Sequence, residues 1–291
     1  KKVSYELFDY NGGSRIKLTA QENAPTFFNA ALNYNSYAKA ALILNVTARN
    51  FLGRNTRFSS TINIADMFRF KSEYFKYLGS AKTHGLGIKF SYDGNELPIF
   101  EGENQLAQYA QKYTAIDIKY QIATLTVNTA GAGIMREYIV FTPSIFGARN
   151  NYDGSLIQDR VYLDFNLNTL DRHYYSRKGS KINMSLGYLF NNSPSFNIIS
   201  RDTFSGNLTT NKMTQTLEDS LVASKYLQFK LISNRFFPIN KRTTILFGFS
   251  SGFTLNPFEH NSDASSIYNN FMLGGLIPNF RNQIPFIGLS D

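Results

Sequence analysis

One segment has the spacing of a catalytic serine. Gly248-Phe249-Ser250-Ser251-Gly252 fits the G-x-S-x-G pattern, in which the serine projects from a strained turn between a strand and a helix. The residues that follow, Thr254 and Leu255, continue an extended pattern instead of starting a helix. We therefore interpret the segment as part of a strand whose small residues face a lumen, and we predict no catalytic residue in this chain.

The sequence predicts no metal or cofactor site. His84, His173 and His260 are too widely spaced for metal ligands, and the acidic residues within 193–223 lack the order of a calcium loop. The chain has no cysteine, which excludes disulfides and thiolate sites. It also has no phosphate-binding loop and no dinucleotide fingerprint.

The dominant pattern is an alternation of apolar and polar residues. Every second residue is apolar from Val161 to Asn168, and the segments 116–122 and 182–190 repeat this pattern. Successive side chains of a strand point to opposite faces, so each segment has one apolar and one polar face. About ten such segments, without an apolar run long enough for a spanning helix, are typical of a transmembrane antiparallel β-barrel. The alternative is a soluble β-sandwich or a large soluble barrel.

The composition agrees with the membrane interpretation. Aromatic residues make up 15% of the chain, which suits aromatic girdles at the two membrane interfaces. The formal net charge of +9 invites a nucleic-acid interpretation. The basic residues are scattered, however, and Lys89, Lys119 and Lys230 fall on the polar sides of strands. We predict that the basic residues line the lumen or contact anionic lipid headgroups, and that the protein does not bind nucleic acid.

Turn signals divide the chain after residue 25 into eleven predicted strands. Asp93-Gly94-Asn95 predicts a hairpin turn, residues 101–111 a loop with one helical turn, and Ala130–Gly133 a further turn. Residues 193–223 form the longest predicted loop, on the outer side of the membrane, and 255–291 an irregular tail. The predicted strands are 26–35, 39–51, 56–65, 69–79, 85–92, 113–127, 132–142, 159–170, 180–192, 225–236 and 242–254.

The first 24 residues differ from the rest. Arg15–Glu22 predicts one short strand, which ends before Pro25 because proline cannot donate to a β-ladder. We therefore divide the chain into a unit of residues 1–24 and a barrel of residues 25–291. Single-chain bacterial barrels have an even number of strands, so eleven strands predict a barrel incomplete at its C-terminus, unless a missed hairpin closes it at twelve. The N-terminus lacks a signal peptide, which predicts a longer natural precursor.

Five charged residues fall on polar strand faces and are our lumen candidates. Charges inside a barrel can pair with one another or line a water path. Two roles therefore stay open, a network that makes the wall rigid and the lining of a channel. The five residues are Arg49, Asp117, Lys119, Asp164 and Lys230.

Three segments near the start resemble the barrel of the bacterial surface antigen superfamily. Phe27–Tyr34 and Ala40–Asn45 resemble its first two strands, and Thr47–Gly53 resembles its "RN-L-G" turn. The superfamily includes BamA/TamA-like outer-membrane assembly factors, two-partner secretion transporters and patatin-like phospholipases with a C-terminal barrel. The resemblance implies a 16-stranded barrel in the bacterial outer membrane, with strands 1–11 and the start of the twelfth in this chain. It also implies that residues 1–24 end a periplasmic POTRA-like domain.

A second resemblance lies near the end. Phe271-Met272-Leu273-Gly274-Gly275 resembles the "F-LGG" segment that opens the sixth extracellular loop of these barrels. In the assembly factors that loop continues to a "VRGF" motif whose arginine enters the lumen. This chain lacks the motif, and Arg281 is the only arginine nearby. The ending Pro285–Leu289 is more similar to the barrels of patatin-like proteins. The resemblance thus implies Gly274, Gly275 and Arg281 as loop-six candidates.

The leading functional interpretation is an outer-membrane barrel that acts as the anchor or translocation platform of an N-terminal patatin-like phospholipase domain. The alternative is an assembly or secretion factor whose first strand, Thr26–Asn35, pairs weakly with the last strand and opens for client strands. Asn29 and Asn33 are poor strand formers and would weaken that seam. A diffusion channel or porin is the third interpretation. We expect outer-membrane lipids, client or accessory envelope proteins and a second copy of the chain as candidate partners, and no cofactor.

Overall fold

The structure is all-β. In the described part of the chain almost every residue belongs to a β-strand, and no helix there is long and apolar enough to cross a membrane. The structure is a computed structural model, and it describes residues 2–10, 13–21, 25–35, 39–65, 68–101, 104–124, 127–145, 151–172, 175–201, 208–212, 225–240, 242–255, 271–273 and 283–284.

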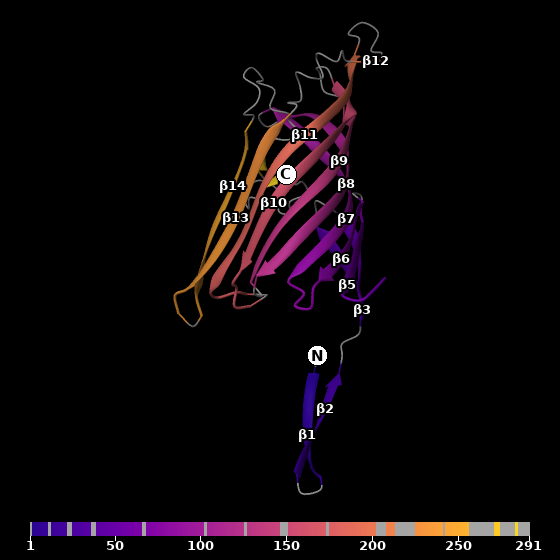
Figure 1. The fold of residues 1–291 in the computed structure, drawn as a ribbon. Coiled ribbons are helices and arrows are strands. Elements are labelled where there is room, and N and C mark those ends of the chain that lie inside the picture. Colours follow the sequence, from indigo (N-terminus) through magenta and orange to yellow (C-terminus); the bar gives the residue numbers. More distant parts are fainter. Residues whose placement is uncertain are drawn as a thin grey trace.

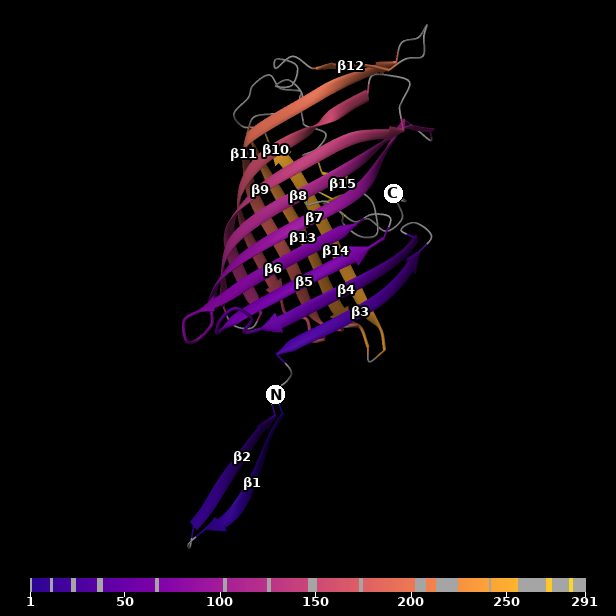
Figure 2. The same ribbon diagram turned by 90° about the vertical axis from the view of Figure 1, so that its right-hand side faces the viewer.

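The main feature is one large antiparallel sheet, curved about a long axis into a barrel wall (Figures 1 and 2). Each strand pairs with its neighbours in sequence, and β12 (Leu208–Lys212) is added to the upper end of β11. The expected antiparallel barrel fold is therefore confirmed. Its eleven consecutive strands are β3 (Thr26–Asn35), β4 (Lys39–Arg49), β5 (Thr56–Ile64), β6 (Arg69–Leu78), β7 (His84–Glu101), β8 (Asn104–Thr124), β9 (Asn128–Ile145), β10 (Asn151–Asn168), β11 (Gly179–Arg201), β13 (Tyr226–Pro238) and β14 (Thr244–Leu255).

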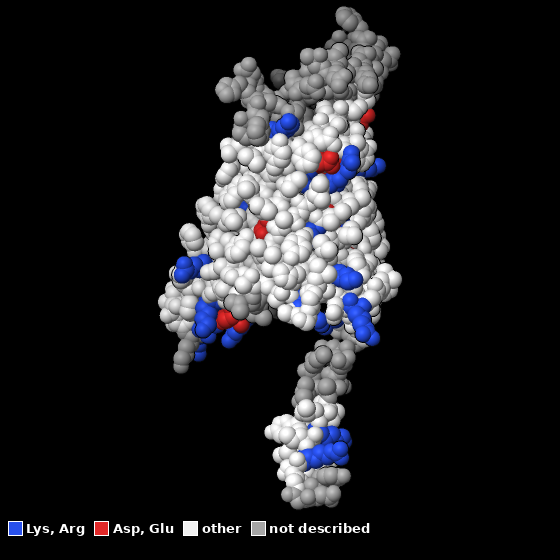
Figure 3. All heavy atoms as spheres, viewed as in Figure 1, with Lys and Arg blue, Asp and Glu red and all other residues white. Residues whose placement is uncertain are grey.

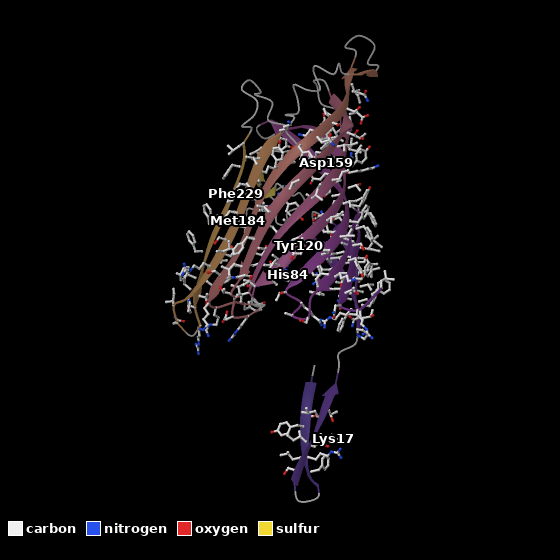
Figure 4. The ribbon with its side chains drawn as sticks, viewed as in Figure 1. Lys17, His84, Tyr120, Asp159, Met184 and Phe229 are labelled. Carbon is white, nitrogen blue, oxygen red and sulfur yellow. The ribbon has the colours of Figure 1, made fainter. Side chains whose placement is uncertain are left out.

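The pleat separates two chemically different faces. In β8, the outward-facing Ile116 and Ile118 are about half exposed, whereas the inward-facing Ala115 is 4% exposed. The outward positions of neighbouring strands are also apolar, and Figure 4 marks Met184 and Phe229 among them. Phe229 stacks on Phe253 of the next strand, with ring centroids 5.0 Å apart. The predicted alternation is thus real, with an apolar outer face and a polar inner face.

Short connections gather at one end of the wall. The connections β4–β5, β6–β7, β8–β9, β10–β11 and β13–β14 all lie at the lower end in Figure 1, and we call them the lower rim. The β11–β13 connection, which contains β12, lies at the opposite, upper end. Length does not separate the two ends as expected, because the connections β3–β4, β5–β6 and β7–β8 at the upper end have only two to four residues.

Several predicted boundaries were wrong because residues typical of turns lie inside paired strands. Strand β10, for example, begins at Asn151 and not at the predicted 159. Asp93-Gly94-Asn95 is not a hairpin turn: β7 runs to Glu101 and β8 begins at Asn104, so the predicted loop 101–111 is mostly strand. Asp93 and Asn95 are buried on the inward face, and the Gly94 amide donates to the Phe68 carbonyl at 3.0 Å. A local turn signal is overruled here by pairing with both neighbouring strands.

The glycine-rich segment Ala130–Gly133 is likewise inside a strand, β9, and not a turn. Strand β11 continues nine residues beyond the predicted end at 192, through an irregularity at Asn191. Asn191 has φ 54° and lies where the register between β10 and β11 shifts. Asparagine tolerates this left-handed conformation better than most residues, which explains how a bulge fits inside a long strand.

The N-terminal residues form a separate hairpin of β1 (Lys2–Tyr10) and β2 (Gly13–Gln21), drawn below β3 in Figure 1. The strand predicted at 15–22 is confirmed as β2, but its partner β1 was not predicted. An exposed ion pair joins Lys17 Nζ to Glu6 Oε2 at 3.7 Å, and such pairs contribute at most about 1 kcal/mol. The assignment of residues 1–24 to a POTRA-like domain stays a prediction.

Two short pieces of the C-terminal segment lie against the inner face of the wall. β15 (Met272–Leu273) and β16 (Gln283–Ile284) pair in parallel with each other, outside the main sheet. The Phe271 ring packs so closely on inward-facing Gly252 that an added Cβ there would lie 2.5 Å from the ring. Figures 1 and 2 show β15 inside the curve of the sheet. The described part of residues 271–284 is therefore not the start of a twelfth wall strand.

Candidate functional site: the inner wall

An ion pair joins two strands of the inner wall that are not neighbours. Lys119 Nζ of β8 lies 2.9 Å from Asp164 Oδ2 of β10, and Asn166 Nδ2 donates to the same oxygen at 2.9 Å. Strand β9 lies between β8 and β10 and presents Gly131 at this point. A Cβ on Gly131 would stand 2.6 Å from Lys119 Cε and 2.7 Å from Asp164 Oδ1. The glycine therefore leaves the space in which the ion pair crosses β9.

A similar contact across β9 lies two residues further toward the upper end of the wall. The Tyr162 hydroxyl of β10 donates to Asp117 Oδ1 of β8 at 2.7 Å. Gly133 of β9 lies beneath the phenol, and a Cβ there would be 2.6 Å from the Tyr162 oxygen. The Arg160 guanidinium stands 4.9 Å from the Tyr162 ring centroid and donates from Nη2 to Ser185 Oγ of β11 at 2.9 Å. Side chains of β8, β10 and β11 thus form one connected layer.

A second layer lies nearer the upper end, where the inner wall is fully buried. Glu137 of β9 is 0% exposed and accepts bonds from the Tyr113 hydroxyl at 2.7 Å and from Gln158 Nε2 at 2.6 Å. Tyr226 of β13 in turn donates to Gln158 Oε1 at 3.1 Å. Leu156 and other inward residues around this layer are also buried. The inward side chains of this part of the wall are therefore covered by other parts of the protein.

A third cluster holds the β5–β7 part of the wall. Asp93 of β7 is buried between Arg69 Nε at 3.8 Å and Lys71 Nζ at 3.7 Å. Arg57 Nη2 of β5 lies 2.6 Å from Glu73 Oε1 of β6. Both acidic groups of this cluster therefore have cationic neighbours, which the buried Asp93 carboxylate needs because an unpaired buried charge is costly.

The inward side chains described above form hydrogen bonds and ion pairs with one another. No catalytic arrangement is present among the described residues. Ser250 lies inside β14, on the inward face opposite Ile232 of β13, with strand before and after it. The interpretation of the G-x-S-x-G segment as part of a strand is therefore confirmed. His84 begins β7, where its Nδ1 lies 2.7 Å from the Tyr120 hydroxyl on the outer face (Figure 4). Among the described residues no group of three His, Cys, Asp or Glu side chains could hold a metal ion.

The five lumen candidates occupy inward positions but not one site. Asp117, Lys119 and Asp164 belong to the layer that crosses β9. Lys230 is half buried on β13, opposite Ser185 of β11 and Gly252 of β14. Arg49 is exposed at the lower end of β4, where its backbone amide donates to the Pro25 carbonyl.

The seam candidates lie on β3, and the loop-six candidates cannot be placed. Asn29 and Asn33 pair in register with Asn45 and Ala41 of β4, on the inward face. β3 has β4 as its one strand partner within the described chain. Gly274, Gly275 and Arg281 are outside the described residues.

Sequence reasoning missed several members of the network, above all Glu137, Arg160 and Tyr162. Arg160 and Tyr162 lie at the same parity as Asp164, the recognised inward residue of β10, whereas Glu137 lies on β9, where no inward candidate was named. Extending the alternation upward from the recognised strand cores would have found them. The glycine gaps in β9 could not be found in this way, because they depend on side chains from two other strands.

Comparisons with known proteins show similarity of fold. No protein-family model matches the chain, and no curated protein matches it. A solved structure of BamA from Haemophilus ducreyi lacking POTRA domains 1–3 aligns over 95% of this chain and 50% of its own, with a TM-score of 0.60 and 12% identity. CdiB from Escherichia coli aligns over 87% of this chain and 45% of its own, with a TM-score of 0.48 and 10% identity. The chain thus spans about half the length of these structures, and the BamA-like barrel fold is confirmed.

Proposed function

We propose that this chain is the wall of a bacterial outer-membrane β-barrel, of the bacterial surface antigen type, that serves as a platform for inserting or translocating other envelope proteins. Two findings support a membrane barrel: the apolar outer face of the curved sheet and the BamA-like fold. A continuous sheet satisfies the backbone groups that lipid cannot, and an unpaired group in lipid costs several kcal/mol.

The single observation that carries the choice of function is the burial of inward side chains in the upper part of the wall. The layer around Glu137 and Gln158 is 0% exposed, and Phe271 of the C-terminal segment packs on the inner face of β14. A diffusion channel needs a water-filled lumen, so these features disfavour the porin interpretation. They suit a barrel whose function is at its wall or edge.

The edge strand that we assign to client contact is β3. Phe28 is 65% and Leu32 86% exposed, and Asn29 and Asn33 interrupt its strand-forming residues. A strand edge offers backbone donors and acceptors to an added strand, with side-chain pockets supplying selectivity. A client strand could therefore extend the sheet at β3.

Site-specific photo-crosslinking in cells tests this function. A benzophenone amino acid at Phe28 is compared with the same residue at Leu163, which is 58% exposed on the outer face of β10 in mid-wall. We expect adducts with other envelope proteins from position 28 and only lipid contact from position 163. Equal protein adducts at both positions, or none at position 28 in protein recovered from the outer membrane, would contradict the platform function.

The second candidate is a barrel that anchors a patatin-like phospholipase domain, supported by the resemblance of Pro285–Leu289 to such barrels. Intact mass and terminal sequencing of the native protein, purified from outer membranes, separate the two. An N-terminal lipase-type domain would support the anchor, whereas POTRA-like modules would support the platform. A mass of 33.0 kDa, that of these 291 residues, would contradict both candidates.

A further inference from the structure

The lower rim is strongly basic. Its described connections contain six Lys or Arg residues and one carboxylate, that of Asp171. Figure 3 shows Lys and Arg side chains gathered at this end of the wall. The six cations belong to four different connections and are Arg54, Lys82, Arg172, Arg177, Lys178 and Arg242.

The carboxylate of Asp171 offsets only one of these six positive charges. Its Oδ1 accepts the backbone amides of Arg177 at 2.9 Å and Lys178 at 3.2 Å, and these bonds hold the pKa of Asp171 below its usual value. Arg172 Nε is 4.0 Å from Asp171 and still 61% exposed. Arg177 donates from Nη2 to the Asn240 carbonyl at 2.8 Å, which ties the β10–β11 and β13–β14 connections together.

The same connections expose apolar side chains beside the cations. Tyr175 is 94% exposed, Leu52 77% and Ile239 61%. At the lower end of β13, Arg235 stands 4.9 Å from the ring centroid of outward-facing Phe237. Apolar tips interleaved with flexible cations are typical of surfaces that lie at lipid headgroups, where the apolar part enters the acyl boundary and the charge stays in water.

We propose that the lower rim binds the headgroups of anionic phospholipids in the leaflet at this end of the barrel. This inference rests on the proposed membrane-spanning barrel. Lipid is the expected ligand for two reasons. The rim continues directly from the apolar outer face through Phe237, and its cations are distributed over four connections around the wall. An acidic protein partner would require them on one contiguous patch.

The experiment uses the quenching of a single tryptophan by brominated lipids. The chain has no tryptophan, so Phe237→Trp reports only its own surroundings. Tyr138→Trp supplies a matched reporter on the upper outer face, where Arg136 is paired with Asp159 at 3.7 Å. The protein is reconstituted in phosphatidylcholine vesicles that contain brominated phosphatidylglycerol or brominated phosphatidylcholine, and quenching gives the relative affinity of the two lipids at each reporter.

We expect phosphatidylglycerol to bind roughly fivefold more tightly than phosphatidylcholine at position 237, as one nearby cation contributing about 1 kcal/mol would produce, and about equally at position 138. The variant Arg172→Gln/Lys178→Gln/Arg235→Gln/Arg242→Gln, which also removes the cation beside position 237, should abolish the preference there. The matched variant Arg54→Gln/Lys82→Gln, in more distant connections, should leave it unchanged there.

Three outcomes overturn the inference. Equal affinity of the two lipids at position 237 would assign the rim to another partner, such as an acidic protein. A preference that survives the fourfold substitution would show that these cations do not produce it. Absence of quenching by brominated phosphatidylcholine at both reporters would show that the protein is not in the bilayer, and the proposed barrel would fail together with the rim.

Discussion

The middle of the described sheet and its β3 end are built differently. Strands β7 to β11 have 18 to 23 residues, and their inner side chains bond across neighbouring and even non-neighbouring strands. Strands β3 to β6 have 9 to 11 residues, and the inner face of β4 and β5 carries short-range polar bonds, such as Asn45 Nδ2 to Thr61 Oγ1 at 2.8 Å. The difference teaches that one barrel wall can combine a cross-linked region with a lightly held edge.

The largest effect is expected from Glu137→Ala in the cross-linked region. The substitution leaves Tyr113 and Gln158 without their shared acceptor in a buried layer, which should lower the free energy of unfolding by about 2–4 kcal/mol. Urea unfolding in lipid vesicles measures it. The control Glu137→Gln retains an acceptor and should lose less. A loss below about 1 kcal/mol for the alanine variant would contradict the role of this layer.

The glycine gap in β9 gives the next effect. Gly133→Ala should displace the Tyr162 phenol from Asp117 and cost about 1–3 kcal/mol, because the new Cβ would stand 2.6 Å from the Tyr162 oxygen. Gly94→Ala is the matched control, since its Cβ would be 3.6 Å from the nearest atom. In a double-mutant cycle with Tyr162→Phe the two effects should not add. Fully additive effects would show that the substitution at Gly133 does not act through Tyr162.

At the lightly held edge the expected effect has the opposite sign. Asn29→Val/Asn33→Val should stabilise β3 by up to about 1 kcal/mol per residue, because valine is a better strand former. If β3 opens for clients, client insertion should slow in the same variant. The pair Asn45→Val/Asn63→Val, on β4 and β5, is the comparison. Faster or unchanged client insertion in the β3 variant would show that Asn29 and Asn33 do not weaken the seam.

The smallest effect belongs to Asp171 in the lower rim. Its pKa is lowered in the folded protein, so its contribution to stability is present above the unfolded-state pKa, about 4, and is lost as the pH falls through the folded-state value. Asp171→Asn should therefore melt at a slightly lower temperature than the parent at pH 7, and the difference should shrink below pH 4. A difference in melting temperature that grows as the pH falls would contradict a lowered pKa of Asp171 in the folded protein.

The sequence predicted the strands wherever alternation was uninterrupted. The bounds of β3 are those expected, and Asp117, Lys119 and Asp164 lie together in the layer that crosses β9. The hairpin expected at Asp93-Gly94-Asn95 failed because turn residues are read locally, whereas strand pairing decides their conformation. The partnership of Lys119 with Asp164, 45 residues away, could not be predicted, because it requires the register of three strands and an absent side chain at Gly131.

The bridges over β9 also have a mechanical consequence. A strand in a meander is normally held by its two backbone ladders, so a pulling force can extract it with one neighbour as a hairpin. Here Lys119–Asp164 and Asp117–Tyr162 fasten β8 directly to β10, with β9 beneath them. Extraction of β9 with either neighbour must break both bridges. In single-molecule pulling from a membrane we therefore expect β8, β9 and β10 to leave in one force event instead of two.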